Sequence, residues 1–327
     1  YNGNESGLLG IATQDNDVFL YFTESFEGIS PEKPNKYTVY HYSWDGDNLT
    51  NPILIKELSA DFWSHNGGVF AKGQSEEIYF VIGDDNKRTI FQNDPSVPSS
   101  NETGSIFKIH TDDDNRVELF AVGIRNSFGL AVDPLTGNLW QTENGMQVYD
   151  EINLVENRFN SGWSAITGPS DRVDAITDPV LFEKGIQSLE GFVYSDPEFS
   201  WYNAVGSTAI AFPDMTNFAK YQDWLFVGDF NHGKIYKFQL NPDRTEFIFS
   251  HPKLKDLVLD PKDIDNYPEI NDELVFAQFP GGITDIKFAH DIMYVVVPFA
   301  DGYGKNTGAI YKIYSNQAIL PPLKQYN

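Results

Sequence analysis

The 327-residue chain contains no cysteine, only 3 methionines and only 6 histidines. The absence of cysteine excludes disulfides, thiolate metal sites and cysteine nucleophiles. Basic residues are scarce as well, since 23 lysines and arginines face 47 acidic residues and leave a formal net charge of −24. Such a surface repels phosphates, so neither nucleic acid nor an anionic membrane is an expected partner.

Long hydrophobic runs are also missing. The longest apolar stretch lies near residues 292–300 and is far too short to cross a bilayer, which predicts no transmembrane segment. The chain begins at Tyr1 without an initiating methionine or a signal sequence, which indicates processing or trimming. Asn-X-Ser/Thr sequons at Asn4, Asn48 and Asn101 lie in polar, turn-like sequence and favour an extracytoplasmic protein, a glycoprotein that is secreted or at the cell surface.

Aromatic residues are abundant, at 15% of the chain. Together with β-branched residues they outweigh the helix formers, and no sustained 3.6-residue hydrophobic stripe appears, so the chain is predicted to be all-β. The many carboxylates also make calcium sites easy to build.

A two-strand unit recurs along the chain: a strand led by glycine or serine, a polar turn and an aromatic-rich strand. It occurs at residues 7–12 with 18–23, 67–72 with 78–83, 129–134 with 139–142, 207–212 with 224–229, and 282–288 with 293–297. A third strand with the pattern Gly-X-Ile-aromatic-Lys follows at residues 104–109, 233–238 and 308–313. Antiparallel units repeated at this period are typical of propeller blades, and a β-sandwich does not explain the repeat.

We therefore predict a β-propeller of four-stranded antiparallel blades, forming a single domain over residues 1–315 with a tail at 316–327. Five units are visible in the sequence. A sixth blade would lie before Tyr1 or form from irregular sequence such as residues 178–202.

One histidine has a strong claim to chemistry. His65 stands in Ser64-His65-Asn66-Gly67-Gly68, at the opening of the second repeat unit. The alternative is a histidine at the propeller mouth that only hydrogen-bonds a neighbouring strand. The other five histidines are scattered without the spacing of metal ligands and are predicted to be structural or surface residues.

Three stretches carry a resemblance to a known family. They are residues 5–12, His65-Asn66-Gly67-Gly68 with Gly83-Asp84, and a long stretch from Gly123-Ile124-Arg125-Asn126 through Asp150-Glu151 to Gly162-Trp163. Together they resemble the soluble pyrroloquinoline-quinone (PQQ)-dependent sugar dehydrogenases of the glucose/sorbosone and aldose sugar dehydrogenase type. Weaker similarity covers most of the remaining chain.

The resemblance implies a six-bladed propeller that oxidises the anomeric hydroxyl of a small-molecule aldose sugar by hydride transfer to PQQ. His65 matches the position of the family's general base, and imidazole has a suitable pKa for that role. Arg125 matches a catalytic, cofactor-binding guanidinium that stabilises charge on the quinone. Asn126 and Glu5 match further cofactor contacts. Electrons would then pass to a soluble acceptor or a redox partner protein.

The resemblance also implies Ca²⁺. The backbone carbonyls of Gly145 and Met146 match the calcium that holds the quinone, and Asp150 and Glu151 match a second, structural calcium region. Met146 departs from the proline usual in the family, and Ser161 stands where a structural-calcium tyrosine often precedes the Gly-Trp pair.

A further departure bears on the cofactor. Gly282 and Thr284 fall in a segment where the family carries one or two arginines that clamp the cofactor's carboxylates, so Thr284 is the predicted cofactor contact there. Lys287 is the nearest lysine or arginine in the sequence. Two functions therefore stay open: a PQQ-dependent sugar dehydrogenase, or a non-catalytic extracellular propeller of the same lineage that serves as a surface binding or structural module.

Overall fold

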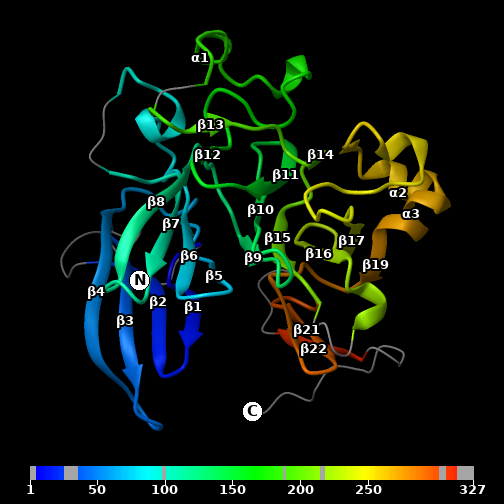
Figure 1. Ribbon diagram of the computed structural model, residues 1–327. Helices are drawn as coiled ribbons and strands as arrows, with labels where there is room; N and C mark the ends of the chain where they lie inside the picture. Colours follow the sequence, from blue (N-terminus) through cyan, green and yellow to red (C-terminus); the bar gives the residue numbers. More distant parts are fainter. Residues whose placement is uncertain are drawn as a thin grey trace. The chain divides into compact units, whose positions relative to one another are not determined.

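The computed structural model describes residues 5–25, 36–97, 101–186, 189–213, 218–301 and 307–314 (Figure 1). The chain divides into two compact units. Unit 1 comprises Tyr1–Val132 with Val155–Asp196, and unit 2 comprises Asp133–Leu154 with Pro197–Asn327. The predicted tail at 316–327 lies outside the described residues.

Unit 1 contains two sheets. The first is a four-stranded antiparallel meander of β1 (Leu8–Gln14), β2 (Asp17–Glu24), β3 (Lys36–Trp44) and β4 (Leu49–Ser59). The second has the order β13-β12-β8-β7-β6-β5, formed by β5 (Phe70–Lys72), β6 (Glu77–Ile82), β7 (Ser105–His110), β8 (Arg116–Val122), β12 (Phe159–Asn160) and β13 (Val193–Tyr194). Strands β5 to β8 are antiparallel, whereas β12 is parallel to β8 and β13 to β12.

Short elements complete unit 1. They are β9 (Gly129–Val132), α1 (Pro179–Glu183) and the 3-10 turns Ile90–Gln92 and Val173–Ala175. Asp178 is the N-cap of helix α1, and its carboxylate accepts hydrogen bonds from the backbone amides of Val180 and Leu181.

Unit 2 contains three groups of strands. The first has the order β18-β14-β11-β10, from β10 (Leu139–Glu143), β11 (Val148–Val155), β14 (Phe199–Asn203) and β18 (Val258–Leu259). The second is β15 (Ser207–Ala211), β16 (Trp224–Asp229), β17 (Lys234–Gln239) and β19 (Val275–Gln278). The third is β20 (Asp285–Ala289), β21 (Ile292–Val297) and β22 (Ala309–Tyr314).

Helices α2 (Lys262–Asn266) and α3 (Pro268–Leu274) and the 3-10 turns Ala219–Tyr221 and Pro252–Leu254 complete unit 2. No helix among the described residues is long and apolar enough to cross a membrane.

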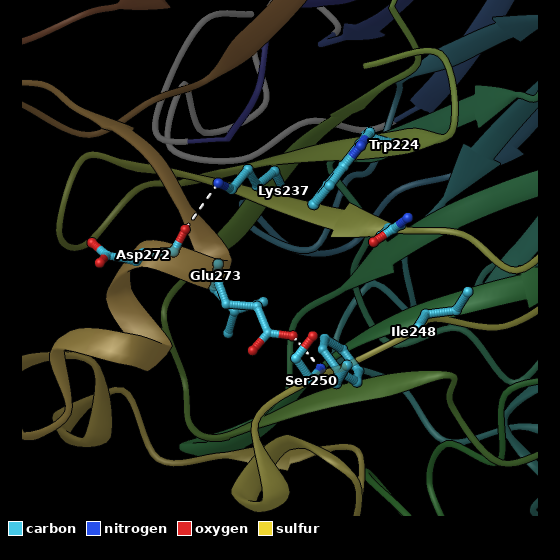
Figure 2. A pocket seen from close by; sticks show the side chains of 9 residues that line it. Trp224, Lys237, Ile248, Ser250, Asp272 and Glu273 are labelled. Carbon is cyan, nitrogen blue, oxygen red and sulfur yellow. Dashed lines mark hydrogen bonds between the residues drawn. The ribbon is translucent and has the colours of Figure 1, made fainter. Parts of the chain in front are cut away.

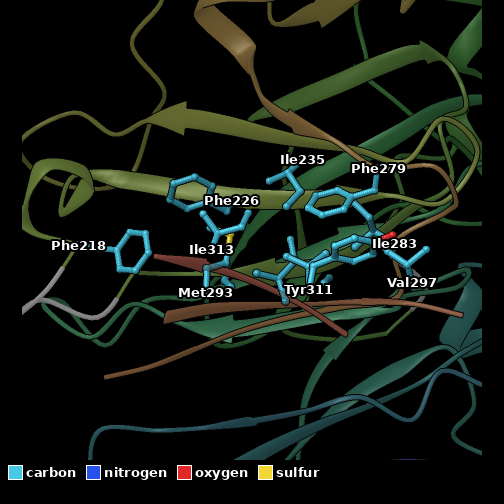
Figure 3. Packing of buried hydrophobic residues seen from close by; sticks show 13 residues of the cluster. Phe218, Phe226, Ile235, Phe279, Ile283, Met293, Val297, Tyr311 and Ile313 are labelled. Carbon is cyan, nitrogen blue, oxygen red and sulfur yellow. The ribbon is translucent and has the colours of Figure 1, made fainter. Parts of the chain in front are cut away.

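A hydrophobic core of unit 2 lies between the sheet of β15, β16, β17 and β19 and the sheet of β20, β21 and β22 (Figure 3). Phe226 and Ile235 from one sheet pack with Met293 and Val295 from the other, and all four are fully buried. Each such side chain stabilises the fold by about 1.5–3 kcal/mol through the hydrophobic effect. The alternation of apolar and polar residues seen in the sequence therefore serves sheet-on-sheet packing.

The predicted repeat is confirmed at the level of strands. The five repeated units form the strand pairs β1 and β2, β5 and β6, β9 and β10, β15 and β16, and β20 and β21. The predicted third strands are β7, β17 and β22. Residues 178–202 supply α1, β13 and β14, and both of those strands join sheets built mainly from other segments. That segment therefore forms no blade of its own, and the number of blades stays a prediction.

Candidate active site

His65 lies in the loop between β4 and β5, and the packing of that loop explains its sequence. The backbone of His65 is left-handed, with φ of +61°, and Gly68 follows with φ of +104°. A Cβ atom at Gly68 would lie 2.6 Å from the ring of Tyr21, so only glycine fits between the loop and β2. The Gly-Gly pair thus lets the chain turn while remaining packed on the first sheet.

Asn66 ties the same loop to its surroundings and is fully buried. Its amide nitrogen donates to the backbone oxygen of Glu5 and to the hydroxyl of Ser6, both at 2.9 Å. The hydroxyl oxygen of Tyr37 lies 2.9 Å from its amide oxygen. Asn66 is therefore a structural anchor that fixes the backbone on the C-terminal side of His65.

Asp85 anchors the N-terminal side of the loop. One of its carboxylate oxygens accepts hydrogen bonds from Tyr37 Oη at 2.6 Å and from the backbone amide of Phe62 at 2.8 Å. Burial raises the pKa of Asp85, although its hydrogen bonds and the nearby Lys87 ammonium oppose that shift. Burial and the Asp85 charge also raise the pKa of Tyr37, which keeps its hydroxyl protonated as a donor.

His65 forms a hydrogen-bonded pair with Asp84, which follows β6. Nδ1 of His65 lies 2.7 Å from Oδ1 of Asp84, and the Asp84 side chain is almost fully buried. A carboxylate oxygen accepts hydrogen bonds, so the proton of a neutral imidazole lies on Nδ1 in this pair, and Nε2 then keeps its lone pair. Among the described residues no group hydrogen-bonds Nε2.

This geometry suits a general base. Nε2 is the atom able to take a proton, while the carboxylate behind Nδ1 orients the ring and stabilises the imidazolium that forms. Only 12% of the His65 side chain is exposed, which limits competition from water.

The predicted partners Arg125 and Asn126 meet His65 in unit 1. The backbone oxygen of Arg125 accepts from the amide of Asp84 at 2.8 Å, and its guanidinium lies over the ring of Trp163, 5.5 Å from the centroid. Trp163 in turn donates from Nε1 to Oδ2 of Asp84 at 2.6 Å. Residues 65 and 125, far apart in the sequence, thus belong to one cluster.

Glu5 and Asn126 complete that cluster. Oε2 of Glu5 accepts from the backbone amide of His65 at 2.5 Å and lies 3.5 Å from the amide nitrogen of Asn126. Asn126 is 3% exposed, and its Oδ1 is buried without a hydrogen-bond partner in the part of the chain that the structure describes. A buried polar atom left unpaired costs about 1–3 kcal/mol, so it indicates a group to be bound there.

The sequence analysis gave no role to two members of the cluster, Asp84 and Trp163. Both stand in motifs that carried the family resemblance, Gly83-Asp84 and Gly162-Trp163. A histidine that acts as a base needs an orienting acceptor. That requirement is a chemical signal that a search of the acidic residues near His65 could have used.

Comparison with known proteins identifies the family. The family model described as Glucose / Sorbosone dehydrogenase matches residues 1–258, which is well over half of this chain. The chain belongs to the glucose/sorbosone dehydrogenase family. The resemblance predicted from the sequence motifs is confirmed.

Curated relatives of this glucose/sorbosone dehydrogenase family member are distant. Quinoprotein glucose dehydrogenase B of Acinetobacter calcoaceticus is 27% identical over 199 residues, which are 51% of this chain and 41% of that protein. Aldose sugar dehydrogenase YliI of Escherichia coli is 25% identical over 195 residues, 56% of this chain and 49% of that protein. The chain therefore spans less than half the length of these relatives.

Solved structures show that the fold is shared. A crystal structure of a glucose dehydrogenase matches with a TM-score of 0.68 and 18% identity, covering 95% of this chain and 83% of that one. The PQQ-bound aldose sugar dehydrogenase of Streptomyces coelicolor matches with a TM-score of 0.63 and 19% identity, covering 95% and 80%. The mostly-β architecture is thus that of PQQ-type sugar dehydrogenases.

The residues predicted to lie near calcium, among them Asp150, Gly145 and Met146, belong to unit 2. Asp150 is fully buried; Oδ1 accepts from the amide of Gly145 at 3.0 Å, and Oδ2 accepts from the amides of Gly206 and Ser207 at 2.6 and 3.0 Å. Burial raises the pKa of Asp150, against these hydrogen bonds. Asp150 thus fixes the turn that carries Gly145 and Met146.

Glu151 is also buried and accepts from Nδ2 of Asn153 at 3.1 Å. The described residues contain no group of three or more acidic or histidine side chains arranged to hold a metal ion. A site built from backbone carbonyls, as predicted at Gly145 and Met146, does not depend on such a group. Calcium binding stays a prediction.

The segment that should clamp the cofactor has a structural reason to lack an arginine at 282. A Cβ atom at Gly282 would lie 2.2 Å from the backbone oxygen of Phe230, so no side chain fits. Thr284 is exposed, and Lys287, whose side chain is 61% exposed, lies 3.4 Å from the carboxylate of Asp285.

A separate cavity of about 130 Å³ lies in unit 2 (Figure 2). Trp224 and Lys237 line one side, and Ser250 and Glu273 line the other. None of the predicted site residues lines this cavity. It is therefore distinct from the His65 cluster.

Proposed function

We propose that this protein is a PQQ-dependent dehydrogenase that oxidises the anomeric hydroxyl of an aldose sugar to the lactone. The observation that carries the proposal is the His65–Asp84 pair, with Nδ1 held at 2.7 Å and Nε2 open, in one cluster with Arg125 and Asn126. Family membership supplies the reaction class.

The oxidation removes two electrons and two protons from the sugar. Nε2 of His65 takes the hydroxyl proton, and Asp84 stabilises the imidazolium. When bound, PQQ supplies the acceptor for the hydride that leaves the anomeric carbon. Electrons then pass to a soluble acceptor or a redox protein.

The residues of unit 1 fit the quinone end of that cofactor. The side-chain amide nitrogen of Asn126 could donate to a quinone oxygen, whereas its buried amide oxygen, which has no hydrogen-bond partner among the described residues, suits a hydroxyl or N–H donor on a ligand. The Arg125 guanidinium supplies positive charge where negative charge develops on reduction. Glu5 would be a further polar contact. In unit 2, Thr284 would contact the cofactor, and the carbonyls of Gly145 and Met146 would hold Ca²⁺, with Asp150 and Glu151 at a second calcium region.

The proposal is tested by replacing the base. His65→Ala is expected to lower kcat for sugar-dependent dye reduction by about 10²- to 10⁴-fold, the usual contribution of general base catalysis. The absorbance change on titration with PQQ and Ca²⁺ should persist in the variant. His232→Ala is a matched control, because His232 also pairs through Nδ1 with a buried aspartate, Asp229 at 3.0 Å. Unchanged turnover in His65→Ala would remove His65 from the role of base.

A second candidate function is a non-catalytic propeller that binds or supports a surface partner. Gly282 and Thr284 favour it, because they stand where the family is expected to have arginines that bind the carboxylates of PQQ. Without those arginines, a chain of net charge −24 would repel the three carboxylates of the cofactor. Titration of the protein with PQQ and Ca²⁺ separates the two functions. A saturable spectral change at micromolar PQQ supports the dehydrogenase, and its absence supports the binding module.

We also propose an extracytoplasmic location. Asn48 is exposed at the turn between β3 and β4, as an acceptor for a glycan must be. The side chain of Asn101 donates to the backbone oxygen of Ser59 at 2.8 Å, and Asn4 lies outside the described residues. Protein from its natural source that shows no mass loss on deglycosylation would remove this support.

A further inference from the structure

Trp163 makes two contacts that join the candidate base to the candidate cation. Its Nε1 lies 2.6 Å from Oδ2 of Asp84, and its ring lies under the guanidinium of Arg125, 5.5 Å from the centroid. Its backbone is held as well, because its amide donates to Gly123 O at 3.1 Å and its carbonyl accepts from Asn93 Nδ2 at 2.8 Å. Hydrogen bonds therefore hold both the indole N–H and the backbone of Trp163.

Because of the Trp163 hydrogen bond, the two oxygens of the Asp84 carboxylate have different side-chain partners. Oδ1 faces Nδ1 of His65, and Oδ2 faces the indole N–H. An indole N–H donates only, so it can fix a carboxylate without competing for the histidine proton. Without it, Oδ2 would be buried and unpaired, and only the donors on Oδ1 would hold the carboxylate, namely Nδ1 of His65 and the backbone amide of Asn86 at 2.9 Å.

This bond is specific to Trp163. Trp140 and Trp201 are more deeply buried, yet in the described part of the chain their Nε1 atoms have no hydrogen-bond acceptor. The Trp163–Asp84 bond is therefore not a general consequence of burying a tryptophan in this fold.

We propose that Trp163 is a positioning residue that sets the Asp84 carboxylate against His65 and places the Arg125 guanidinium in the same cluster. It thereby maintains the Nδ1–H tautomer of His65 and leaves Nε2 as the proton acceptor. The Arg125 guanidinium lies over the same indole, 5.5 Å from the ring centroid, so one side chain contacts both the acceptor that orients the base and the cation. The catalytic consequence rests on the proposed function, whereas the tautomer is a property of the protein alone.

The tautomer is tested first by NMR on the protein without cofactor or sugar. The ring nitrogens of His65, assigned with the His65→Gln variant, are expected to show a protonated Nδ1 and an unprotonated Nε2 whenever the ring is neutral. Trp163→Phe removes the N–H donor and keeps an aromatic ring, and is expected to shift His65 toward a mixture of tautomers. Trp201→Phe removes the same atoms from a buried tryptophan without an acceptor and should leave the His65 signals unchanged.

Kinetics on protein loaded with PQQ and Ca²⁺ then test the consequence. Trp163→Phe is expected to lower kcat about 10- to 100-fold with little change in KM for the sugar, as removal of an outer-shell partner commonly does. Trp201→Phe should retain wild-type kcat. A fall in kcat that Trp201→Phe shares would overturn the positioning role, because it would reflect packing alone.

One further measurement uses only the wild-type protein. The indole N–H resonance of Trp163 in the wild-type protein should move as His65 titrates, because both groups bind one carboxylate. A Trp163 resonance that ignores the His65 titration, or an unchanged His65 tautomer in folded Trp163→Phe, would overturn the inference. Absence of sugar oxidation in the wild-type protein would instead contradict the proposed function and leave the NMR result to stand.

Discussion

At the scale of single residues, the proposed chemistry depends on how one carboxylate is shared. Asp84 accepts from Nδ1 of His65, from the indole of Trp163 and from the backbone amide of Asn86 at 2.9 Å. Three donors on one buried carboxylate keep it in place without any additional cation. The ring of His65 therefore has one orientation, which is the condition for efficient proton transfer.

Asp84→Asn tests that arrangement. An amide offers a single acceptor oxygen, so it cannot accept from both His65 and Trp163 in the present geometry. We expect kcat to fall by about 10²- to 10⁴-fold, since the histidine would lose its tautomer as in other histidine–aspartate pairs. Steady-state dye reduction measures this, and PQQ affinity should change little.

Asp17→Asn is the control for Asp84→Asn, because Asp17 also lies 2.6 Å from a histidine nitrogen, Nε2 of His41, but its side chain is half-exposed at the start of strand β2. Equal losses in both variants would contradict a specific role for Asp84.

At the scale of elements, close backbone approach decides which positions can carry function. The backbone of Gly68 packs closely against the ring of Tyr21, and the backbone of Gly282 packs closely against the carbonyl of Phe230. The first contact creates the turn that presents His65. The second removes a position at which relatives are expected to place a charged side chain, so packing and cofactor binding compete for the same residue.

Gly282→Ala should expose that packing constraint. Its Cβ would meet Phe230 O at 2.2 Å, and overpacking of this kind costs about 1–3 kcal/mol. We expect a lower midpoint in denaturant unfolding with an unchanged m-value. Thr284→Ala, two residues away and exposed, should change stability by less than about 0.5 kcal/mol. An unchanged midpoint in Gly282→Ala would show that the loop has room to yield.

At the scale of the whole molecule, charge is the dominant property. A formal net charge of −24 makes the folded chain repel itself, and salt screens that repulsion over about 8 Å at physiological ionic strength. The same charge attracts divalent cations, so general screening and specific calcium binding must be separated by experiment.

Thermal unfolding makes that separation, first over a series of sodium chloride concentrations and then with each divalent cation at constant ionic strength. Sodium chloride should raise the Tm at first and then reach a plateau. Ca²⁺ should raise the Tm further than Mg²⁺ does, because a ligand that binds the folded state alone stabilises it, by about 2.7 kcal/mol at a hundred times its Kd. EDTA should reverse the increment. Equal effects of Ca²⁺ and Mg²⁺ would contradict a calcium site at Gly145 and Met146.

Local pattern was enough to predict the strands of the repeated units. Alternating apolar residues and the repeated Gly-X-Ile-aromatic-Lys segment predicted β7, β17 and β22, because strand burial has a period of two residues that is visible in the sequence. Motifs likewise predicted the family, and they predicted that His65 and Arg125 lie near each other, as the contacts of both with Asp84 show. The parallel additions β12 and β13 were not predicted, since two-residue strands have no pattern of their own.

Only the tertiary structure decided which groups complete the site. Asp84 and Trp163 lie 19 and 98 positions from His65, and nothing local in the sequence says that they share a carboxylate bond. It also decided that Gly282 has no room for a side chain. The sequence by itself determines strands and motifs because these depend on neighbouring residues. Hydrogen bonds between distant residues depend on how whole sheets pack, which no short stretch of sequence encodes.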